Sequence, residues 1–281
     1  MTPRISIITP SYNQGQFLEK TILSVLSQDY PNLEYIIIDG GSVDSSVDII
    51  KKYENQLSYW VSEKDKGQTH AINKGLRRAT GELVNWLNSD DLLEPNALNI
   101  FSRAVLEHPD SDAYFGDYRA INASGDTIYA RKSAPYSRNA LFWGRQLSSQ
   151  PSVFFKRSLL DRVGYLDETK HFCMDTEFWI RCTESGAKFT LIPESLGVTR
   201  VHCDTKTANL QNVLRNEHKI IVRGYNSLKR FKPNSMPEDI CFTGMNHFWR
   251  LSAAMRRMVF RQDFSFFQAS KALETIKQEM K

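Results

Sequence analysis

The sequence predicts an α/β fold in which a mostly parallel sheet is flanked by helices, with a helical C-terminal extension. Three observations support this prediction. Over the first 95 residues, short apolar runs alternate with stretches of helical periodicity, as in strand–helix–strand units. The apolar runs are hydrophobic at successive positions, which is typical of strands covered by helices on both faces. From residue 206 the pattern is helical to the end, with one break at 232–239.

The elements of the first 95 residues follow in a regular order. β-branched residues fill the expected strands, and Phe17, Ile22 and Val25 show the spacing of a helix face. We expect strands at Ile5–Pro10, Leu33–Ser42, Leu57–Glu63 and from Gly81 onward, with helices at Gln16–Gln28, Val43–Glu54 and Gln68–Thr80.

The region from about 110 to 205 is less regular. A hairpin is expected around the turn "NASG", followed by a strand that runs into a helix, a helix that ends at a glycine, and a final strand. These elements are expected at Asp112–Lys132, Pro151–Gly164, Asp175–Gly186 and Ala187–Glu194. We therefore divide the chain into an α/β domain, 1–205, and a basic helical extension, 206–281. Within the domain, 1–95 is the regular half and 96–205 the less regular half.

Charge is distributed unevenly along the chain. The net charge is +4, but residues 206–281 hold 14 basic and 6 acidic residues, a net +8, which leaves −4 for the rest. An acidic body argues against nucleic-acid binding, whereas the basic tail suggests an anionic partner. The chain shows neither a signal peptide nor an apolar run of the roughly 18 residues that a membrane span needs. A cytoplasmic location is expected.

Polar loops follow each of the four expected strands. They are "TPSYN" at Thr9–Asn13, "DGGS" at Asp39–Ser42, "EKDKG" at Glu63–Gly67 and "NSDD" at Asn88–Asp91. Ligands of parallel sheets bind beyond the carboxyl ends of the strands, where these loops should meet. A single aspartate there could simply be a turn residue or a helix cap. Several carboxylates at one edge would repel each other unless a cation or hydrogen-bond donors compensate their charge.

A divalent cation is one way to compensate that charge. Mg²⁺ and Mn²⁺ favour oxygen ligands, and proteins often hold them through one or two carboxylates together with substrate phosphates. The chain contains no GxxxxGK[ST] motif and no GxGxxG after the first strand. Kinase, ATPase and dehydrogenase chemistry are thereby disfavoured. What remains is an enzyme that binds a nucleoside diphosphate through a metal.

Two long stretches resemble the family 2 glycosyltransferases. They are "SIITPSYNQGQFLEKTILSVLSQDYPNLEYIIIDGGSVDSS" and "SEKDKGQTHAINKGLRRATGELVNWLNSDDLL". The resemblance is specific over residues 4–95 and looser from about 110 to 205. It implies a GT-A fold, with a Rossmann-like nucleotide-binding sheet, and transfer of a sugar from a nucleotide sugar with inversion at the transferred carbon. Residues 1–205 would then be the GT-A catalytic domain, with 1–95 as its nucleotide-sugar-binding half and 96–205 as its acceptor-side half.

The resemblance also implies roles for residues at the strand ends. Asp39 would accept a hydrogen bond from the nucleotide base, and Asp65 and Lys74 would border the nucleotide and diphosphate. Asn88, Ser89 and Asp90 occupy the DxD position of the family. The full implied nucleotide-sugar set is Pro10, Tyr12, Asn13, Asp39, Asp65, Lys74, Asn88, Ser89 and Asp90.

The DxD position departs from the family pattern, because Asn88 replaces the first acidic residue. Its amide would offer a neutral carbonyl ligand or a hydrogen bond to ribose. Asp90, with Asp91 beside it, would then hold the Mn²⁺ or Mg²⁺. His202 fits the place of a metal-binding histidine in the family, although a structural role is equally open. Arg200 and Lys206 would add positive charge near the leaving diphosphate.

The resemblance places a catalytic base at Asp175, with Glu177 as a weaker candidate. A carboxylate within hydrogen-bond reach can take the proton of an attacking sugar hydroxyl. Asp175 also stands at the start of an expected helix, where an aspartate can serve only as a cap. Trp179, one turn further on, would either stack on an acceptor sugar or pack in the core.

Together with the resemblance, these residues predict a metal-assisted glycosyltransferase that uses a nucleotide-sugar donor, most simply a UDP-sugar, and a glycan or lipid-linked acceptor. Inversion is implied by the resemblance alone. A sugar nucleotidyltransferase and a degenerate nucleotide- or glycan-binding module are the alternatives. The tail segment 248–268 interleaves basic and aromatic residues. It would either lie on the inner face of the membrane as an amphipathic helix or pack against the catalytic domain.

Overall fold

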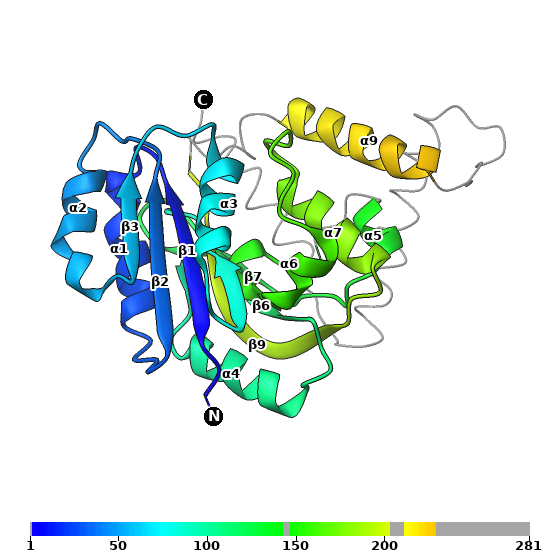
Figure 1. The fold of residues 1–281 in the computed structure, drawn as a ribbon, viewed down its shortest axis with the longest axis horizontal. Helices are drawn as coiled ribbons and strands as arrows, with labels where there is room; N and C mark the ends of the chain where they lie inside the picture. Colours follow the sequence, from blue (N-terminus) through cyan, green and yellow to red (C-terminus); the bar gives the residue numbers. More distant parts are fainter. Residues whose placement is uncertain (1, 143–146, 203–210, 229–281) are drawn as a thin grey trace.

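The computed structural model describes residues 2–142, 147–202 and 211–228 (Figure 1). Within these ranges, nine strands form one sheet in the order β3-β2-β1-β4-β8-β6-β9-β5, with β7 paired to β6. Helices cover both faces of the sheet, as the apolar runs in the sequence predict.

The first half of the sheet is parallel. Its strands are β1 (Ile5–Ser11), β2 (Leu33–Asp39), β3 (Tyr59–Ser62) and β4 (Leu83–Trp86). Ser11 pairs with Asp39, and Asp39 pairs with Ser62, so the carboxyl ends of three strands are level. The predicted strand–helix alternation is confirmed here, with shifts of one to a few residues at the element ends.

Alternate residues of the parallel strands enter two separate cores. Ile5 and Ile7 pack with helices on one face, while Ile8 packs with helices on the other. The first layer contains α1 (Gly15–Leu26), α2 (Ser46–Lys52) and α4 (Ala97–Glu107). The second contains α3 (Gln68–Arg78), α5 (Arg138–Phe142), α6 (Ser158–Val163) and α7 (Met174–Glu184).

The second half of the sheet is mixed. Its strands are β5 (Leu92–Leu93), β6 (Ala113–Ile121), β7 (Thr127–Arg131), β8 (Val153–Lys156) and β9 (Phe189–Arg200). β8 runs antiparallel to β4 and β6, β5 runs antiparallel to β9, and β9 runs parallel to β6. The predicted hairpin is confirmed as β6–β7. Short 3-10 turns at Glu54–Gln56 and Gln150–Ser152 complete the fold.

β9 ends six residues later than the sequence predicts. The prediction ends it at Glu194, whereas the strand continues to Arg200. The pairing shifts from Gly116–Ile192 to Asp117–Ser195, so Pro193 and Glu194 are accommodated in an irregularity of the ladder. Proline is tolerated in strands at such bulges, which is why it gives a false signal of a strand end. β5 and α4 were also not predicted.

The described part of the C-terminal extension is α9 (Gln211–Leu228). It lies over α7 and α5 in Figure 1, and Ile221 enters the core that α7 also lines. A helix after residue 206 is therefore confirmed for this segment. The break at 232–239 and the segment 248–268 lie outside the described residues, so their predicted roles stay predictions.

Candidate active site

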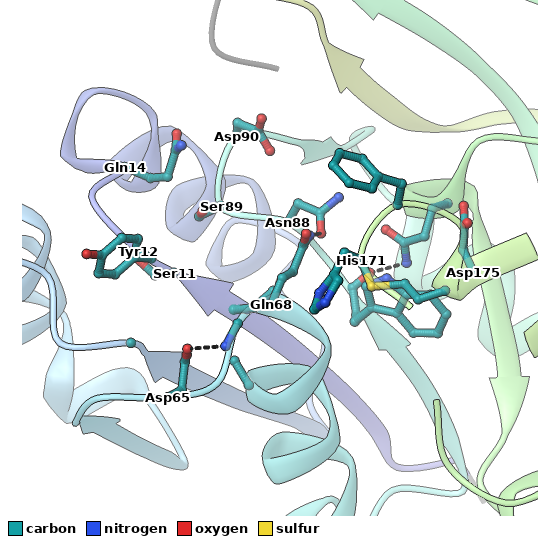
Figure 2. A pocket seen from close by; sticks show the side chains of 18 of the residues that line it. Ser11, Tyr12, Gln14, Asp65, Gln68, Asn88, Ser89, Asp90, His171 and Asp175 are labelled. Carbon is teal, nitrogen blue, oxygen red and sulfur yellow. Dashed lines mark hydrogen bonds between the residues drawn. The ribbon is translucent and has the colours of Figure 1, made fainter. Parts of the chain in front are cut away.

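A cavity of about 550 Å³ lies at the carboxyl edge of the parallel strands. Tyr12 and Asp65 lie at one end of it, Asp175 lies at the other, and Asn88 and His171 lie between them (Figure 2). The loops at the ends of the parallel strands thus share this cavity with the start of α7. The lining includes seven of the predicted site residues: Pro10, Tyr12, Asp65, Asn88, Ser89, Asp90 and Asp175.

Asp39 lies outside this lining, fully buried behind it. Its Oδ2 accepts hydrogen bonds from Gly41 N (3.1 Å), Ser42 N (2.9 Å) and Ser62 Oγ (2.7 Å), and its Oδ1 accepts one from Ser42 Oγ (2.5 Å). Four donors around a carboxylate stabilise its charge without a cation. Asp39 shapes the loop between β2 and α2, and its contact with a base stays a prediction.

Asn13 ties the β1 loop to the same segment. Its backbone N donates to Ser42 Oγ (2.8 Å), and its Oδ1 accepts from Val43 N (2.9 Å). Its φ of 50° is in the left-handed region, which asparagine tolerates better than most residues. Asn13 therefore holds the loop that carries Tyr12, whose side chain is exposed at the mouth of the cavity.

The loop after β3, Glu63–Gly67, brings Asp65 to the cavity, whereas Lys74 lies outside the cavity lining. Asp65 Oδ1 accepts from Gly67 N (2.7 Å) just before α3. A Cβ on Gly40 would lie 2.7 Å from Asp65 Oδ2, so a larger residue there would require the Asp65 side chain to shift. Lys74 forms an ion pair with the exposed Glu63.

The "NSDD" loop separates its two aspartates. Asp90 lines the cavity, whereas Asp91 is buried beneath it. Asp91 Oδ1 accepts from Arg200 N (2.9 Å), and its Oδ2 accepts from Asn88 Nδ2 (3.0 Å). Burial and the neighbouring Asp90 raise the pKa of Asp91, and the two hydrogen bonds oppose that rise. This position does not agree with the prediction that Asp91 is a metal ligand, because both of its oxygens are bound within the protein.

Asn88 occupies the position between this buried carboxylate and the cavity. Its Nδ2 donates to Asp91, and its Oδ1 accepts from Gln68 Nε2 (2.8 Å). Gln68 is the first residue of α3 and also lines the cavity. The amide therefore joins α3 to the "NSDD" loop, a link that needs a donor on one side and an acceptor on the other.

Arg200 supports the loop from behind and does not face the cavity. The side chain is 1% exposed, and its Nε donates to the Asp90 carbonyl (2.9 Å). Its guanidinium also lies 4.8 Å from the centre of the Phe17 ring. Burial lowers the pKa of Arg200, and Asp90 and Asp91 oppose that shift. The predicted contact of Arg200 with a diphosphate is not supported by this position, and Lys206 lies outside the described residues.

His202 lies beside Asp90. Its Nε2 is 3.1 Å from Asp90 Oδ2, and its ring packs against Phe17 at 4.7 Å between centroids. In the described part of the chain, no three histidine, cysteine or acidic side chains form a metal cluster. The chemistry of Asp90 and His202, one carboxylate and one imidazole, nevertheless fits a divalent cation that also takes phosphate oxygens from the substrate.

Asp175 lies at the end of the cavity opposite Tyr12 and Asp65, in the first turn of α7. Its Oδ1 accepts from Thr176 N (2.6 Å). Burial raises the pKa of Asp175, Thr176 opposes the rise, and the charge of Glu217 adds to it. Glu177, the weaker candidate, is bound at 2.7 and 2.8 Å to Arg181 and lies outside the lining, as expected of a structural carboxylate.

Trp179 lies in the core. It is 4% exposed and stacks on Trp86, with 5.8 Å between ring centroids and 12° between planes. Trp86 itself lines the cavity, so Trp179 supports the wall from behind. The structure therefore favours the packing role of Trp179 over stacking on an acceptor sugar.

Several lining residues were missed in the sequence, among them Gln68, Gln150, His171 and Phe172. Gln68 could have been found, because it opens a helix directly after a strand-end loop. His171 and Phe172 stand shortly before Asp175 and were also open to inference. Gln150 reaches the cavity from a 3-10 turn before β8, and only the tertiary fold shows this.

Comparison with known proteins identifies the family. The model of "Glycosyl transferase family 2" matches residues 6–181, more than half of the chain. The chain belongs to glycosyltransferase family 2. An uncharacterized glycosyltransferase of Rickettsia typhi is 28% identical over 262 residues, which covers 88% of this chain and 77% of the relative.

Two solved structures share the fold of this family 2 glycosyltransferase. Residues 1–349 of S. aureus TarS, in complex with UDP-GlcNAc, give a TM-score of 0.66 and 19% identity, and the match covers 94% of this chain and 75% of that TarS chain. The mannosyltransferase PcManGT of Pyrobaculum calidifontis, in complex with GDP-Man and Mn²⁺, has a TM-score of 0.59 and 20% identity, covering 100% and 81%. The predicted GT-A fold is confirmed. Within the described ranges, no helix of this glycosyltransferase has the length and hydropathy required to cross a bilayer.

Proposed function

We propose that this glycosyltransferase is inverting and metal-assisted, and that it moves a sugar from a nucleoside diphosphate, most simply UDP, to a hydroxyl of a glycan or lipid-linked acceptor. The observation that carries the proposal is the shared cavity, which Asp90 lines from the strand-end side and Asp175 from the start of α7. A site for a charged diphosphate and a base for a hydroxyl thus face one space.

The donor would lie across the strand-end loops. Tyr12 offers an exposed ring beside the expected base position, and Asn88 and Ser89 offer polar groups toward the ribose. Asp90 and His202 would hold the cation, which offsets charge on the departing diphosphate when it is bound. TarS with UDP-GlcNAc and PcManGT with GDP-Man and Mn²⁺ support this donor class and this cofactor.

Asp175 would act as general base. The acceptor hydroxyl oxygen bonds to the anomeric carbon of the donor, its proton passes to the Asp175 carboxylate, and the bond from that carbon to the diphosphate oxygen breaks. Attack from the face opposite the leaving group inverts the configuration. A base works best when its pKa lies near the operating pH. The burial that raises the pKa of Asp175 therefore favours this role.

Replacing Asp175 tests the proposal. Asp175→Asn keeps the shape of the side chain and is expected to reduce transfer by about 100-fold or more while leaving the donor affinity unchanged. Because the ionised carboxylate is required, wild-type transfer should fall as the pH drops through the raised pKa of Asp175, above the usual range of an aspartate near 3.9. Transfer rates against pH, donor affinity by calorimetry and the anomeric configuration of the product by NMR provide the measurements.

The exposed Asp110, far along the chain from the cavity lining, provides a matched control as Asp110→Asn. Retained transfer by Asp175→Asn would exclude Asp175 as the base. Wild-type protein that binds a nucleotide sugar but neither transfers nor hydrolyses it with Mn²⁺ would instead support a binding module. Formation of a nucleotide sugar from a nucleoside triphosphate and a sugar phosphate would identify a nucleotidyltransferase.

A further inference from the structure

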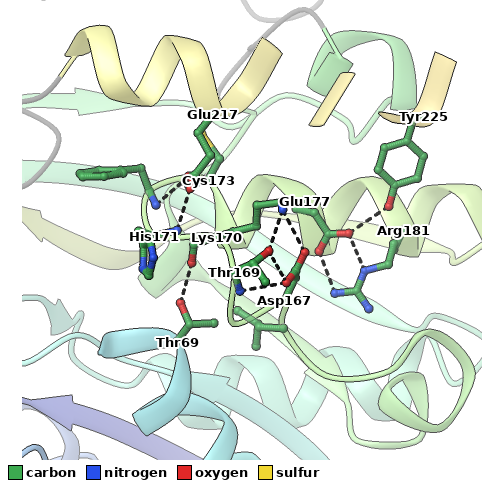
Figure 3. Close-up of polar contacts among 12 residues, drawn as sticks. Thr69, Asp167, Thr169, Lys170, His171, Cys173, Glu177, Arg181, Glu217 and Tyr225 are labelled. Atoms are coloured by element: carbon green, nitrogen blue, oxygen red, sulfur yellow. Dashed lines mark hydrogen bonds and ion pairs between the residues drawn. The ribbon is translucent and has the colours of Figure 1, made fainter. Parts of the chain in front are cut away.

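The loop before α7 is held by a helix that the family match does not include. The match ends at residue 181, whereas α9 begins at Gln211. α9 contacts the body of the enzyme through Ile221 in the core and through Tyr225 Oη, which donates to Glu177 Oε1 (3.0 Å). Figure 3 shows Glu217 of α9 above the loop that leads into α7, of which His171 and Phe172 line the cavity.

Glu217 of α9 binds three successive backbone amides of the loop before α7. Its Oε1 accepts from His171 N (2.8 Å), and its Oε2 accepts from Phe172 N (2.7 Å) and Cys173 N (2.6 Å). Figure 3 shows the carboxylate above this turn. Hydrogen bonds to an ionised acceptor are shorter and stronger than those between neutral groups. One side chain therefore fixes the backbone of all three residues.

The same loop is held from the opposite side by α3. Thr69 Oγ1 donates to the Lys170 carbonyl (2.9 Å), and Thr69 follows Gln68, which binds Asn88. The loop thus lies between an anchor on α3, which also contacts the donor loop, and an anchor on α9. His171 and Phe172, which these anchors position, line the cavity, and Asp175 follows two residues after Cys173.

We propose that Glu217 is a positioning residue of the acceptor subsite, which holds His171 and Phe172 as the wall against which an acceptor sugar lies beside Asp175. The inference rests on the proposed function and names the side of the cavity that the acceptor occupies. The exposed imidazole and the half-buried phenyl ring offer the flat, partly apolar surface on which sugar rings pack. The acceptor would therefore be a glycoside whose reacting ring packs on this wall.

Glu217→Gln is the direct test. The substitution keeps the size of the side chain but removes the charge and replaces one acceptor oxygen by an NH₂ group that faces an N–H. We expect the KM for the acceptor to rise by about tenfold or more, from the loss of charge-assisted hydrogen bonds. The donor affinity and the rate of Mn²⁺-dependent donor hydrolysis should not change. The probes are UDP-glucose, UDP-N-acetylglucosamine and GDP-mannose as donors, with para-nitrophenyl glycosides as acceptors.

Two controls separate positioning from general support of the fold. Glu194→Gln removes an exposed carboxylate that pairs with Arg103 on the surface. It should change neither the acceptor KM nor the donor affinity. Tyr225→Phe removes another α9 contact without touching the loop, and it should leave the acceptor KM near the wild-type value. Should Glu217→Gln fail to fold, Phe172→Leu must give the same selective rise in acceptor KM.

The inference is overturned if the acceptor KM of folded Glu217→Gln matches that of the wild type, or if the donor affinity falls equally. It is also overturned if Tyr225→Phe produces the same change, since α9 docking alone would then explain it. Absence of transfer by the wild-type enzyme to every acceptor would count against the proposed function itself. If the wild-type enzyme transfers sugar and the acceptor KM of Glu217→Gln is unchanged, only the role of Glu217 is overturned.

Discussion

At the scale of single residues, Asn88 shows why a neutral side chain suits this donor loop. Its Nδ2 donates to the buried Asp91, and its Oδ1 accepts from Gln68. An aspartate at this position would place a second carboxylate about as close to Asp91 as the present amide, at 3.0 Å. Two carboxylates at that distance cannot both ionise easily. The substitution that restores the family pattern would therefore conflict with the environment in this chain.

Asn88→Asp is expected to destabilise the metal-free protein by about 1–3 kcal/mol, because a donor to a buried carboxylate is lost. The paired carboxylates would have a raised pKa, so the loss should grow as the pH rises through it and shrink at lower pH. Urea unfolding at several pH values without metal provides the measurement. Equal stability of Asn88→Asp and wild type at neutral pH would contradict this account.

At the scale of elements, the close approach of α3 to β1 sets the position of Gln68, which lines the cavity, and of Thr69, which holds the loop before α7. A Cβ on Gly75 would lie 2.3 Å from Ile8 Cγ2, so the helix can pack this closely only because glycine stands there. On α9, by contrast, a Cβ on Gly224 would meet nothing within 4 Å. The same residue type therefore has opposite consequences in two helices.

Gly75→Ala should destabilise the protein by about 1–3 kcal/mol through overpacking, although alanine is the better helix former. Gly224→Ala is the matched control, and it should stabilise the protein by about 0.5–1 kcal/mol through helix propensity alone. Thermal and urea unfolding of both variants test the pair. If both substitutions stabilise, the packing of α3 on β1 is looser than described.

Sequence patterns predict elements well where local and tertiary preferences agree. The strands β1, β2 and β4 are apolar on both faces and were recognised, as were the polar loops that follow them. The length of β9 was missed, because the irregularity at Pro193 is stabilised only by pairing with β6. Contacts between distant residues, such as Glu217 with Cys173, have no local signature, so this anchor could not be predicted.

At the scale of the whole molecule, the cavity joins the parallel and mixed halves of one continuous sheet. The arrangement of the strands explains which predicted site residues line this cavity. Loops at the ends of adjacent parallel strands had to converge, and Asp65, Asn88 and Asp90 did so. Which carboxylate faces inward depends on partners far along the chain, and for this reason the sequence alone does not show that Asp39 and Asp91 are buried behind the lining.

Donor and metal should stabilise the whole domain together. A ligand at 100 times its Kd contributes about 2.7 kcal/mol to the free energy of unfolding. UDP-sugar with Mn²⁺ is therefore expected to raise the Tm by several degrees, and the increase should exceed the sum of the two separate effects because the diphosphate completes the coordination. Differential scanning fluorimetry with and without EDTA measures this. Asp90→Asn should abolish the excess and Asp110→Asn should retain it, whereas an excess that survives Asp90→Asn would argue against Asp90 as a ligand.

The pairing of Asp91 with Arg200 also has a consequence for synthesis on the ribosome. The bond between Arg200 N and Asp91 Oδ1 joins residues 109 positions apart, and β5, directly after the donor loop, pairs with β9. The strands β1 to β4 can pair as soon as they leave the exit tunnel, but the loop that follows them gains its contacts with Arg200 and β9 only after Arg200 has emerged. A nascent chain would thus carry a formed sheet with an unfinished donor site, and nucleotide-sugar binding should begin late in translation.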